Sequence, residues 1–332
     1  MRCENTADNG RELKDTTQYE AAARKRTLAA AALIFILIPA TIIAGALILD
    51  QSMYMPVSLL IIIYTLIPFF MIYEKRKPKA REVVLIAMMS AITTVIHMFF
   101  HITVPIQAGT ALVIISGIAL GPEAGFLVGA LSRFVCNFYM GQGPWTPWQM
   151  FCWGILGFLG GVAFNRIRSG RKYGSEKKRL IEIGSGSISA VAGPMMCLVF
   201  FIILAYVSFM ILPGEDETFF GWRLYVFGAA GLLAGVLLQR KRLPADNLTL
   251  ALFTFFTTFV VYGGLMNVCA MITASPLEGG DPVSFKTLRT LYIAGVPYDA
   301  VHAVTAAIFV FIFGGVFIKK LDRIIIKYGI YR

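Results

Sequence analysis

Charged residues are scarce in this sequence. Asp, Glu, Lys and Arg make up 15% of its 332 residues, whereas hydrophobic residues make up 57%. An aqueous core cannot bury that much apolar surface, so lipid must cover the rest. Apolar runs of about 20 residues, the length that spans a bilayer, recur along the whole chain. The composition therefore excludes a soluble domain with one anchor and predicts a membrane protein throughout.

The common signatures of catalysis are also missing. The sequence has no GxxxxGK[ST] phosphate loop, no GxSxG nucleophile elbow and no HExxH zinc pair, so we predict neither ATP hydrolysis nor another enzyme activity by this chain alone. Its five cysteines are odd in number and show no CxxC spacing, which argues against a disulfide framework or a zinc site. No cofactor or metal is predicted. Uphill movement of a solute would take energy from another subunit or from an ion gradient.

Ten apolar runs are candidates for membrane-spanning helices. The fourth is short, which indicates a broken or tilted helix. If every run crosses, the chain is an all-α, polytopic bundle of about ten spans in the cell (inner) membrane. The predicted spans lie near residues 28–49, 55–73, 82–104, 109–120, 121–140, 148–165, 184–212, 221–238, 248–273 and 297–318.

Basic residues alternate between successive loops, as expected if Lys and Arg are retained on the cytoplasmic side. Five segments hold 26 of the 30 Lys and Arg residues. The intervening connections carry acid, in the runs Gly214-Glu215-Asp216-Glu217 and Glu278-Gly279-Gly280-Asp281. Both termini are therefore predicted to be cytoplasmic, and topology explains the net charge of +11 without a nucleic-acid partner. The basic segments are residues 1–27, 75–81, 166–179, 240–242 and 319–332.

A few polar side chains interrupt the apolar runs. His97 and His101 stand four residues apart and share one helical face, a spacing that can bind metal. We favour the alternative that they line a cavity or bond to neighbouring helices. Arg133 lies inside the fifth predicted span, where a charge should face protein or water, or else snorkel outward.

The connection from Gly141 to Gln149 contains two glycines, two prolines, two indoles and two amides. One interpretation is an aromatic belt at the membrane interface. The other is a lid over an outward-facing pocket, because ring faces and amides suit a large, flat, mostly neutral ligand.

Pro297 is predicted to start the last span, which puts Asp299 in its first turn and His302 one turn further on. A carboxylate there interacts favourably with the helix dipole whether or not anything binds. The alternative interpretation is a pocket wall shared with Asn267 and Tyr262.

Small residues form two patterns. Ala87, Ser90, Ala91 and Thr94 make a stripe on the third span that suits either internal packing or a docking partner. A second pattern repeats at an offset of 74 residues, which indicates a local duplication of one helix or a chance match in a glycine-rich chain. It comprises Trp148, Gly154, Gly157 and Gly161, and then Trp222, Gly228, Gly231 and Gly235.

Two blocks of the sequence resemble the substrate-specific (S) component of energy-coupling factor (ECF) vitamin transporters. The first, Arg81 to Phe164, carries Ala87-Met88-Met89-Ser90-Ala91, the turn Gly121-Pro122-Glu123-Ala124-Gly125 and the loop from Gly141. The second joins Tyr262-Gly263-Gly264-Leu265-Met266-Asn267 to Gly295-Val296-Pro297-Tyr298-Asp299-Ala300-Val301-His302-Ala303.

The resemblance implies a transporter made of several subunits, in which different subunits bind the substrate and supply the energy. S components bind a vitamin from outside, and a transmembrane coupling protein with two ATPase subunits supplies the energy. Ala87, Ser90 and Ala91 are the implied contacts with the coupling protein. The family core has six helices, so the resemblance implies a cytoplasmic tail at 1–27, two additional helices at 28–80, a core at 81–320 with a two-helix insertion near 184–238, and a second tail at 321–332.

For the ligand, the Trp-rich outer loop most resembles S components assigned to cobalamin-type ligands, so a corrinoid is favoured, with riboflavin or another heterocycle as the alternative. Two other functional classes stay open: a secondary transporter with a relay of Arg133, Asp299 and His302, and an intramembrane enzyme using His97, His101 and Asp299. The expected substrate-binding residues are Gln107, Asn137, Gln142, Trp145, Trp148, Gln149, Asn267, Asp299 and His302.

Overall fold

A computed structural model of the chain describes residues 31–48, 53–71, 80–103, 106–164, 188–212, 218–238, 243–274 and 284–328. All of the secondary structure in these ranges is helical, which confirms the all-α prediction. The elements in chain order are η1 (Leu33–Leu37), α2 (Ile38–Leu47), α3 (Tyr54–Met71), α4 (Ala80–Thr103), α5 (Ala108–Leu120), α6 (Pro122–Met140), α7 (Thr146–Phe164), α8 (Ile188–Ile211), α9 (Trp222–Leu238), α10 (Asn247–Phe256), η4 (Thr257–Gly263), α11 (Gly264–Ala274), α12 (Phe285–Phe309), η6 (Val310–Gly314) and α13 (Gly315–Lys327).

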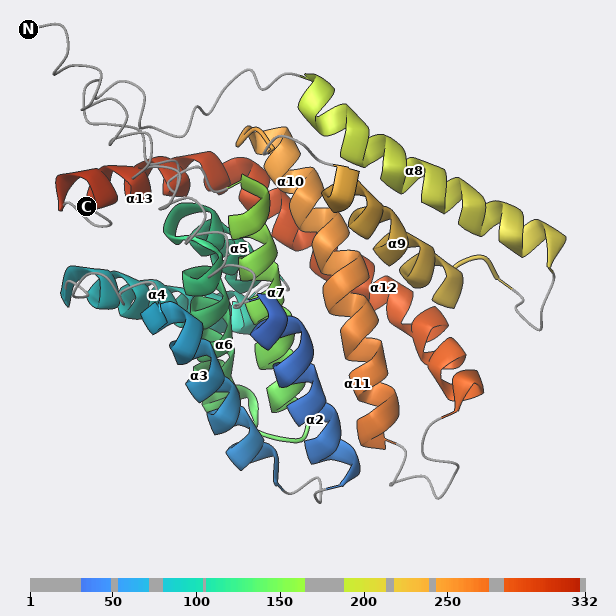
Figure 1. Ribbon diagram of the computed structural model, residues 1–332, viewed down its shortest axis with the longest axis horizontal. Coiled ribbons are helices and arrows are strands. Elements are labelled where there is room, and N and C mark those ends of the chain that lie inside the picture. The colour runs from blue at the N-terminus through green and yellow to red at the C-terminus, as the bar shows by residue number, and fades with distance from the viewer. Residues whose placement is uncertain are drawn as a thin grey trace, which may run out of the picture.

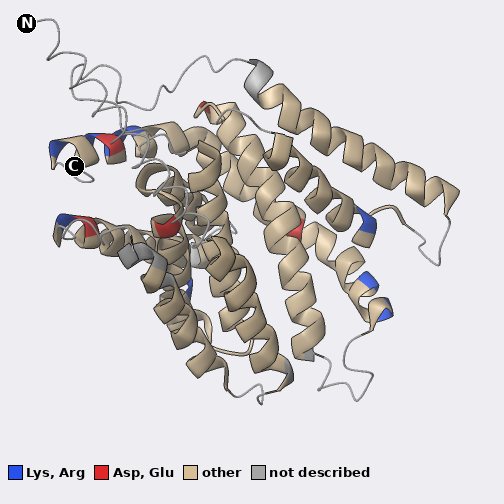
Figure 2. Ribbon diagram, in the orientation of Figure 1, with Lys and Arg blue, Asp and Glu red and all other residues tan. Residues whose placement is uncertain are grey.

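Five helical stretches are long and apolar enough to cross a membrane. They are Ala80–His101, Thr146–Phe164, Val191–Ile211, Asn247–Thr273 and Phe285–Lys327. The remaining predicted spans are shorter or less apolar in the described ranges, so a total of about ten crossings stays a prediction. Figure 2 shows long stretches of uncharged ribbon, with most of the charge near helix ends. The basic loops 166–179 and 240–242 and both acidic connections lie outside the described residues.

The helices are arranged in two neighbouring groups. Figure 1 shows α2 to α7 on one side, α10 to α12 beside them, and α9 and α8 at the far edge. Helix α8 carries exposed apolar side chains along its length, including Met196, Phe200, Ile203 and Met210. These side chains are suited to contact with lipid.

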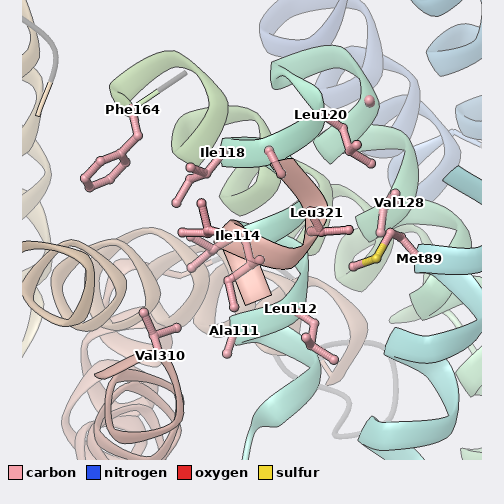
Figure 3. Packing of buried hydrophobic residues seen from close by; sticks show 14 of the residues in the cluster. Met89, Ala111, Leu112, Ile114, Ile118, Leu120, Val128, Phe164, Val310 and Leu321 are labelled. Atoms are coloured by element: carbon pink, nitrogen blue, oxygen red, sulfur yellow. The ribbon is translucent and has the colours of Figure 1, made fainter. Parts of the chain in front are cut away.

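Helix α5 is the centre of the first group, because every residue from Ala108 to Leu120 is buried. It packs against α4, α6 and α7 and, from the C-terminal part of the chain, against α12, η6 and α13. Figure 3 shows Ile114 and Ile118 of α5 in one cluster with Leu321 of α13. A helix that is apolar all round is expected to be enclosed in this way.

Backbones approach very closely where α5, α6 and α7 meet. A Cβ at Gly117 would lie 1.8 Å from the carbonyl oxygen of Gly157, and one at Gly157 would lie 2.3 Å from that of Gly125. Gly121 joins α5 to α6 with φ of 106°, a value that favours glycine. Pro122 then opens α6, where its missing N–H costs nothing.

The glycine pattern that repeats in the sequence has a structural counterpart. In the α6–α7 pair, Gly161 lies against Pro122 and Gly157 against Gly125. In the α8–α9 pair, Gly235 lies against Pro194 and Gly231 against Leu198. Both prolines follow a glycine, so the recurrence covers a pair of helices rather than one, which favours duplication over chance.

The predicted start of the last span at Pro297 is wrong. Helix α12 begins at Phe285, where the Ser284 hydroxyl accepts a hydrogen bond from the Lys286 backbone N–H. Pro297 lies in the helix interior, which packed membrane helices tolerate. The helix also runs past residue 318, through η6 into α13, whose Ile318, Leu321 and Ile325 are buried.

Candidate functional site

A buried arginine organises the first polar cluster. Arg133 of α6 donates from Nη1 to Nε2 of His97 on α4 over 3.0 Å, and from Nε to Oε1 of Gln149 on α7 over 3.0 Å. Its guanidinium carbon lies 5.2 Å from the centre of the Trp153 ring, and the His97 ring meets the same indole edge-on. Three helices therefore hold one guanidinium group in place.

The cluster continues toward the connection between α6 and α7 through amides and a hydroxyl. Asn137 Nδ2 donates to Gln149 Oε1 over 2.8 Å and to Thr146 Oγ1 over 3.2 Å. Thr146 in turn donates to Gln142 Oε1 over 2.9 Å. The sequence placed Asn137, Gln142 and Gln149 in the substrate site, and the structure brings these three together. We call this set the Arg133 cluster: His97, Arg133, Asn137, Gln142, Thr146, Gln149 and Trp153.

Burial decides between the alternatives for Arg133. It is only 7% exposed, and its partner His97 is 2% exposed. Snorkelling is therefore excluded, because the side chain bonds inside the bundle. A charge in mid-membrane costs about 2.5 to 3.5 kcal/mol on insertion scales, and the neutral hydrogen-bond partners offset part of that cost.

A carboxylate organises the second cluster, around Asp299 of α12. Tyr225 of α9 donates its hydroxyl to Asp299 Oδ2 over 2.5 Å, and Asn267 of α11 donates to the same oxygen over 2.9 Å. Tyr292 stacks on Tyr225 with ring centres 4.6 Å apart. We call Tyr225, Asn267, Tyr292 and Asp299 the Asp299 cluster.

The position of Asp299 overturns the capping interpretation. It lies well inside α12 and is therefore not in a first turn. Two glycines make room for its contacts, since a Cβ at Gly263 would lie 2.5 Å from Asp299 Cγ and one at Gly295 would lie 2.4 Å from Asn267 Oδ1. Gly263 also ends η4, a π-helical turn of the kind that is frequent at functional sites. Of the two residues that the pocket-wall interpretation names, Asn267 contacts Asp299, whereas Tyr262 packs against His302, and the pocket itself stays a prediction.

His302 belongs to neither hydrogen-bonded cluster. Its Nε2 lies 2.8 Å from the hydroxyl of Thr110 on α5, and its ring meets Tyr262 at a centroid distance of 4.4 Å. Close by, the backbone N–H of Gln107 donates to Thr305 Oγ1 over 3.3 Å. His302 and Gln107 thus lie where α5 meets α12.

Trp145, just before α7, and Trp148, in the first turn of α7, differ in their surroundings. Trp145 is 42% exposed and packs over Gly143, whereas Trp148 is 6% exposed inside a hydrophobic cluster with Phe126 and Phe151. Only Trp145 therefore has a free ring face for a ligand. The expected role of Trp148 as a substrate-binding residue is at odds with this burial.

The small-residue stripe of α4 is divided between two faces. Ala87 and Ala91 are exposed, together with Val84 and Val95. Ser90 and Thr94 face inward, where Thr94 donates to the Ser90 carbonyl and Ser132 donates to the same group. His97 points inward as well, whereas His101 is exposed. The exposed surface around Ala87 and Ala91, between Val84 and Val95, is therefore apolar.

Sequence reasoning left several of these polar groups out of the substrate site. Arg133 and His97 were noted but assigned to other hypotheses, and a charged residue inside an apolar run was the signal that could have placed them. Thr110, Thr146 and Tyr225 carried no such signal, because a single hydroxyl in a helix is unremarkable without its spatial neighbours.

The groups proposed for a relay or for catalysis do not form one chain. Arg133 bonds His97, Asp299 bonds Tyr225 and Asn267, and His302 bonds Thr110, with no hydrogen bond joining the three sets in the part of the chain that is described. The same ranges contain no group of three His, Cys, Asp or Glu side chains placed to hold a metal ion.

Comparison with known families adds to this geometry. Residues 77–215 match a family model described as ECF-type riboflavin transporter, S component. The resemblance to an ECF S component is thereby confirmed. The matched segment runs from α4 through α8, so it contains the Arg133 cluster and the exposed face of α4 but not Asn267 or Asp299. Together with the apolar helices, the S-component match makes this chain a multi-pass membrane protein. No solved structure matches the chain.

Proposed function

We propose that this chain is the membrane-embedded substrate-binding subunit of an ECF-type importer. The observation that carries the proposal is the S-component match over residues 77–215, which contains a buried polar cluster beneath an outer loop. The chain captures a vitamin from outside and performs no bond chemistry itself. A transmembrane coupling protein and two ATPase subunits supply the energy for uptake.

The ligand is a vitamin with a large heterocyclic ring system. Riboflavin is the first candidate, because the matching family model is described as a riboflavin transporter component. A corrinoid is the second candidate, favoured by the exposed indole of Trp145 beside Gln142 in the outer loop. The proposed ligand contacts are the members of the Arg133 cluster, Trp145 and, from the second group of helices, Asn267, Asp299 and His302.

Contact with the coupling protein is proposed for the apolar face of α4. Ala87 and Ala91 are exposed there, and small side chains let another helix approach closely. Ser90 is not part of this proposed contact, because it is buried against α6.

Two contacts support the proposed topology, in which both termini are cytoplasmic. Arg81 Nη1 donates to the Tyr328 carbonyl over 3.2 Å, which joins two basic segments assigned to the same side. The Leu243 N–H donates to the Ala163 carbonyl over 3.0 Å, which joins the end of α7 to the start of α10. The division into two extra N-terminal helices, a core and an inserted α8–α9 pair is retained as a proposal, although the family match reaches into α8.

Calorimetric titration of the detergent-purified chain tests the binding role. Riboflavin and cobinamide are titrated in parallel, with nicotinamide as a small heterocycle that should not bind. Submicromolar binding of riboflavin or cobinamide supports the proposal and identifies the vitamin. Uptake into vesicles that contain only this chain would instead support a secondary transporter.

A further inference from the structure

The Arg133 cluster contains a buried positive charge without a buried negative one. The contacts of Arg133 within the described ranges are His97, Gln149, the Met140 sulfur at 3.9 Å and the Trp153 ring. None of these four groups carries a formal charge. The Asp299 carboxylate is engaged by Tyr225 and Asn267 instead.

Hydrogen-bond roles in the cluster leave several donors unused. A guanidinium group can only donate, so His97 Nε2 accepts from Arg133 and the ring proton sits on Nδ1. That Nδ1 is buried and unpartnered, and so is the Nε1 donor of Trp153. The Nη2 group of Arg133 makes no hydrogen bond with any described residue. The unpartnered groups of His97, Arg133 and Trp153 are thus all donors, on side chains that touch one another.

One acceptor in the cluster is also unpartnered, the Oδ1 atom of Asn137. An amide oxygen carries no formal charge and cannot neutralise a guanidinium group. It is suited to a hydroxyl or N–H of a ligand that also brings an anion.

From this arrangement we propose that His97, Arg133 and Trp153 bind an anionic oxygen group, a phosphate or a carboxylate, carried by the transported compound. The inference deepens the proposed function and rests on it. The planar guanidinium group matches the geometry of carboxylate and phosphate, the unpartnered ring N–H groups of His97 and Trp153 are further donors in the same cluster, and charge-assisted hydrogen bonds are the strong ones in a site shielded from water. Ligand binding then supplies the negative charge that the protein lacks.

The experiment compares ligands that differ by one phosphate. Riboflavin is paired with riboflavin 5′-phosphate, and cobinamide with cobinamide phosphate. The purified full-length chain is titrated with all four. We expect the phosphorylated member of the pair that binds to bind at least about tenfold more tightly, as a charge-assisted contact provides. Equal affinity, or a preference for the unphosphorylated member, would overturn the inference.

Substitutions of Arg133 test whether the phosphate preference depends on the Arg133 cluster. In Arg133→Gln the ratio of the affinities for the phosphorylated and the unphosphorylated ligand should fall to about 1. In Arg133→Lys part of the preference should remain, because the charge remains. The matched control is Arg223→Gln, which removes a second arginine that is buried in the described ranges and whose Nη2 donates to the carbonyl of Leu212, just after α8. An undiminished preference in Arg133→Gln contradicts the proposal. If neither Arg133 variant folds, the preference of the wild-type chain decides.

A second measurement separates this inference from the proposed function. The melting temperature of the chain is compared in phosphate, acetate and chloride at equal ionic strength. If none of the four vitamins binds but phosphate or acetate stabilises the wild type and not Arg133→Gln, the transport proposal fails and the anion site stands. If the vitamins bind without a phosphate preference, the anion site fails and the transport proposal stands. If nothing binds and no anion stabilises the chain, both fail.

Discussion

The hydroxyl of Tyr225 donates to Asp299 Oδ2 over 2.5 Å and so ties α9 to α12. Helix α9 belongs to the pair that the sequence treated as an insertion, yet it supplies one of the two hydrogen bonds that the described residues make to this partly buried carboxylate. The inserted pair is therefore part of the folded core rather than an appendage.

Removing that hydroxyl should destabilise the chain. In Tyr225→Phe, the partly buried Asp299 keeps only Asn267 as a donor among the described residues, and the net contribution of a hydrogen bond is about 0.5 to 1.5 kcal/mol. We expect a lower melting temperature in detergent. Tyr206→Phe is the control, because Tyr206 is 52% exposed on α8. Equal melting temperatures for the two variants would mean that the α9–α12 contact adds nothing to stability.

The crossing of α5 and α7 should not tolerate a methyl group. Gly117→Ala places a Cβ 1.8 Å from the Gly157 carbonyl oxygen, so the backbones must separate. We expect little monodisperse protein on size exclusion. Gly193→Ala is the matched control, since no atom lies within 4 Å of the added Cβ. A normal yield of Gly117→Ala would show that the crossing is loose.

The proposed docking face should be separable from binding. Ala87→Trp with Ala91→Trp should abolish uptake and copurification with the coupling protein, while vitamin affinity stays unchanged, because both positions face away from the bundle. Ala229→Trp, at an exposed alanine of α9, is the control and should leave uptake intact. Normal uptake in the double variant would remove the docking proposal.

Trp145 and Trp148 should respond differently to truncation. Trp145→Ala should weaken vitamin binding with little change in melting temperature, because that ring is exposed. Trp148→Ala should lower the melting temperature, since truncating a buried Trp costs about 3 to 5 kcal/mol. Calorimetry and a thermal melt on each variant check this, and unchanged affinity in Trp145→Ala would remove the lid hypothesis.

How much the sequence could predict depended on whether the signal was local. Apolar runs are local, and each of the ten predicted segments contains a helix in the described ranges. Gly157 and Gly161 belonged to the repeated small-residue pattern, but their partners Gly125 and Pro122 became known only from the structure. The start of the last helix was predicted wrongly at Pro297, because proline is commoner in the first turn of a helix than in its interior. Helix α12 accommodates Pro297 in its interior.

The candidate site was less predictable, because its groups meet across distant helices. Asn137, Gln142 and Gln149 are near in sequence and were grouped correctly in space. Tyr225 lies 74 residues from Asp299, and no pattern in either segment predicts that the two residues are in contact. Whether Ser90 faces the partner or the bundle depends on the rotation of α4, which a stripe of four small residues does not determine.

Helix α5 has 13 residues, so at about 1.5 Å per residue it is about 20 Å long, shorter than the roughly 30 Å hydrocarbon layer. It also has no surface left for lipid, because all of its residues are buried. A segment that neither reaches both interfaces nor contacts acyl chains is not expected to be stable in the membrane as an isolated helix. We therefore expect α5 to take its final position only after α4, α6 and α7 have packed around it. Substitutions that disturb those helices should then appear during biogenesis as a failure to integrate α5.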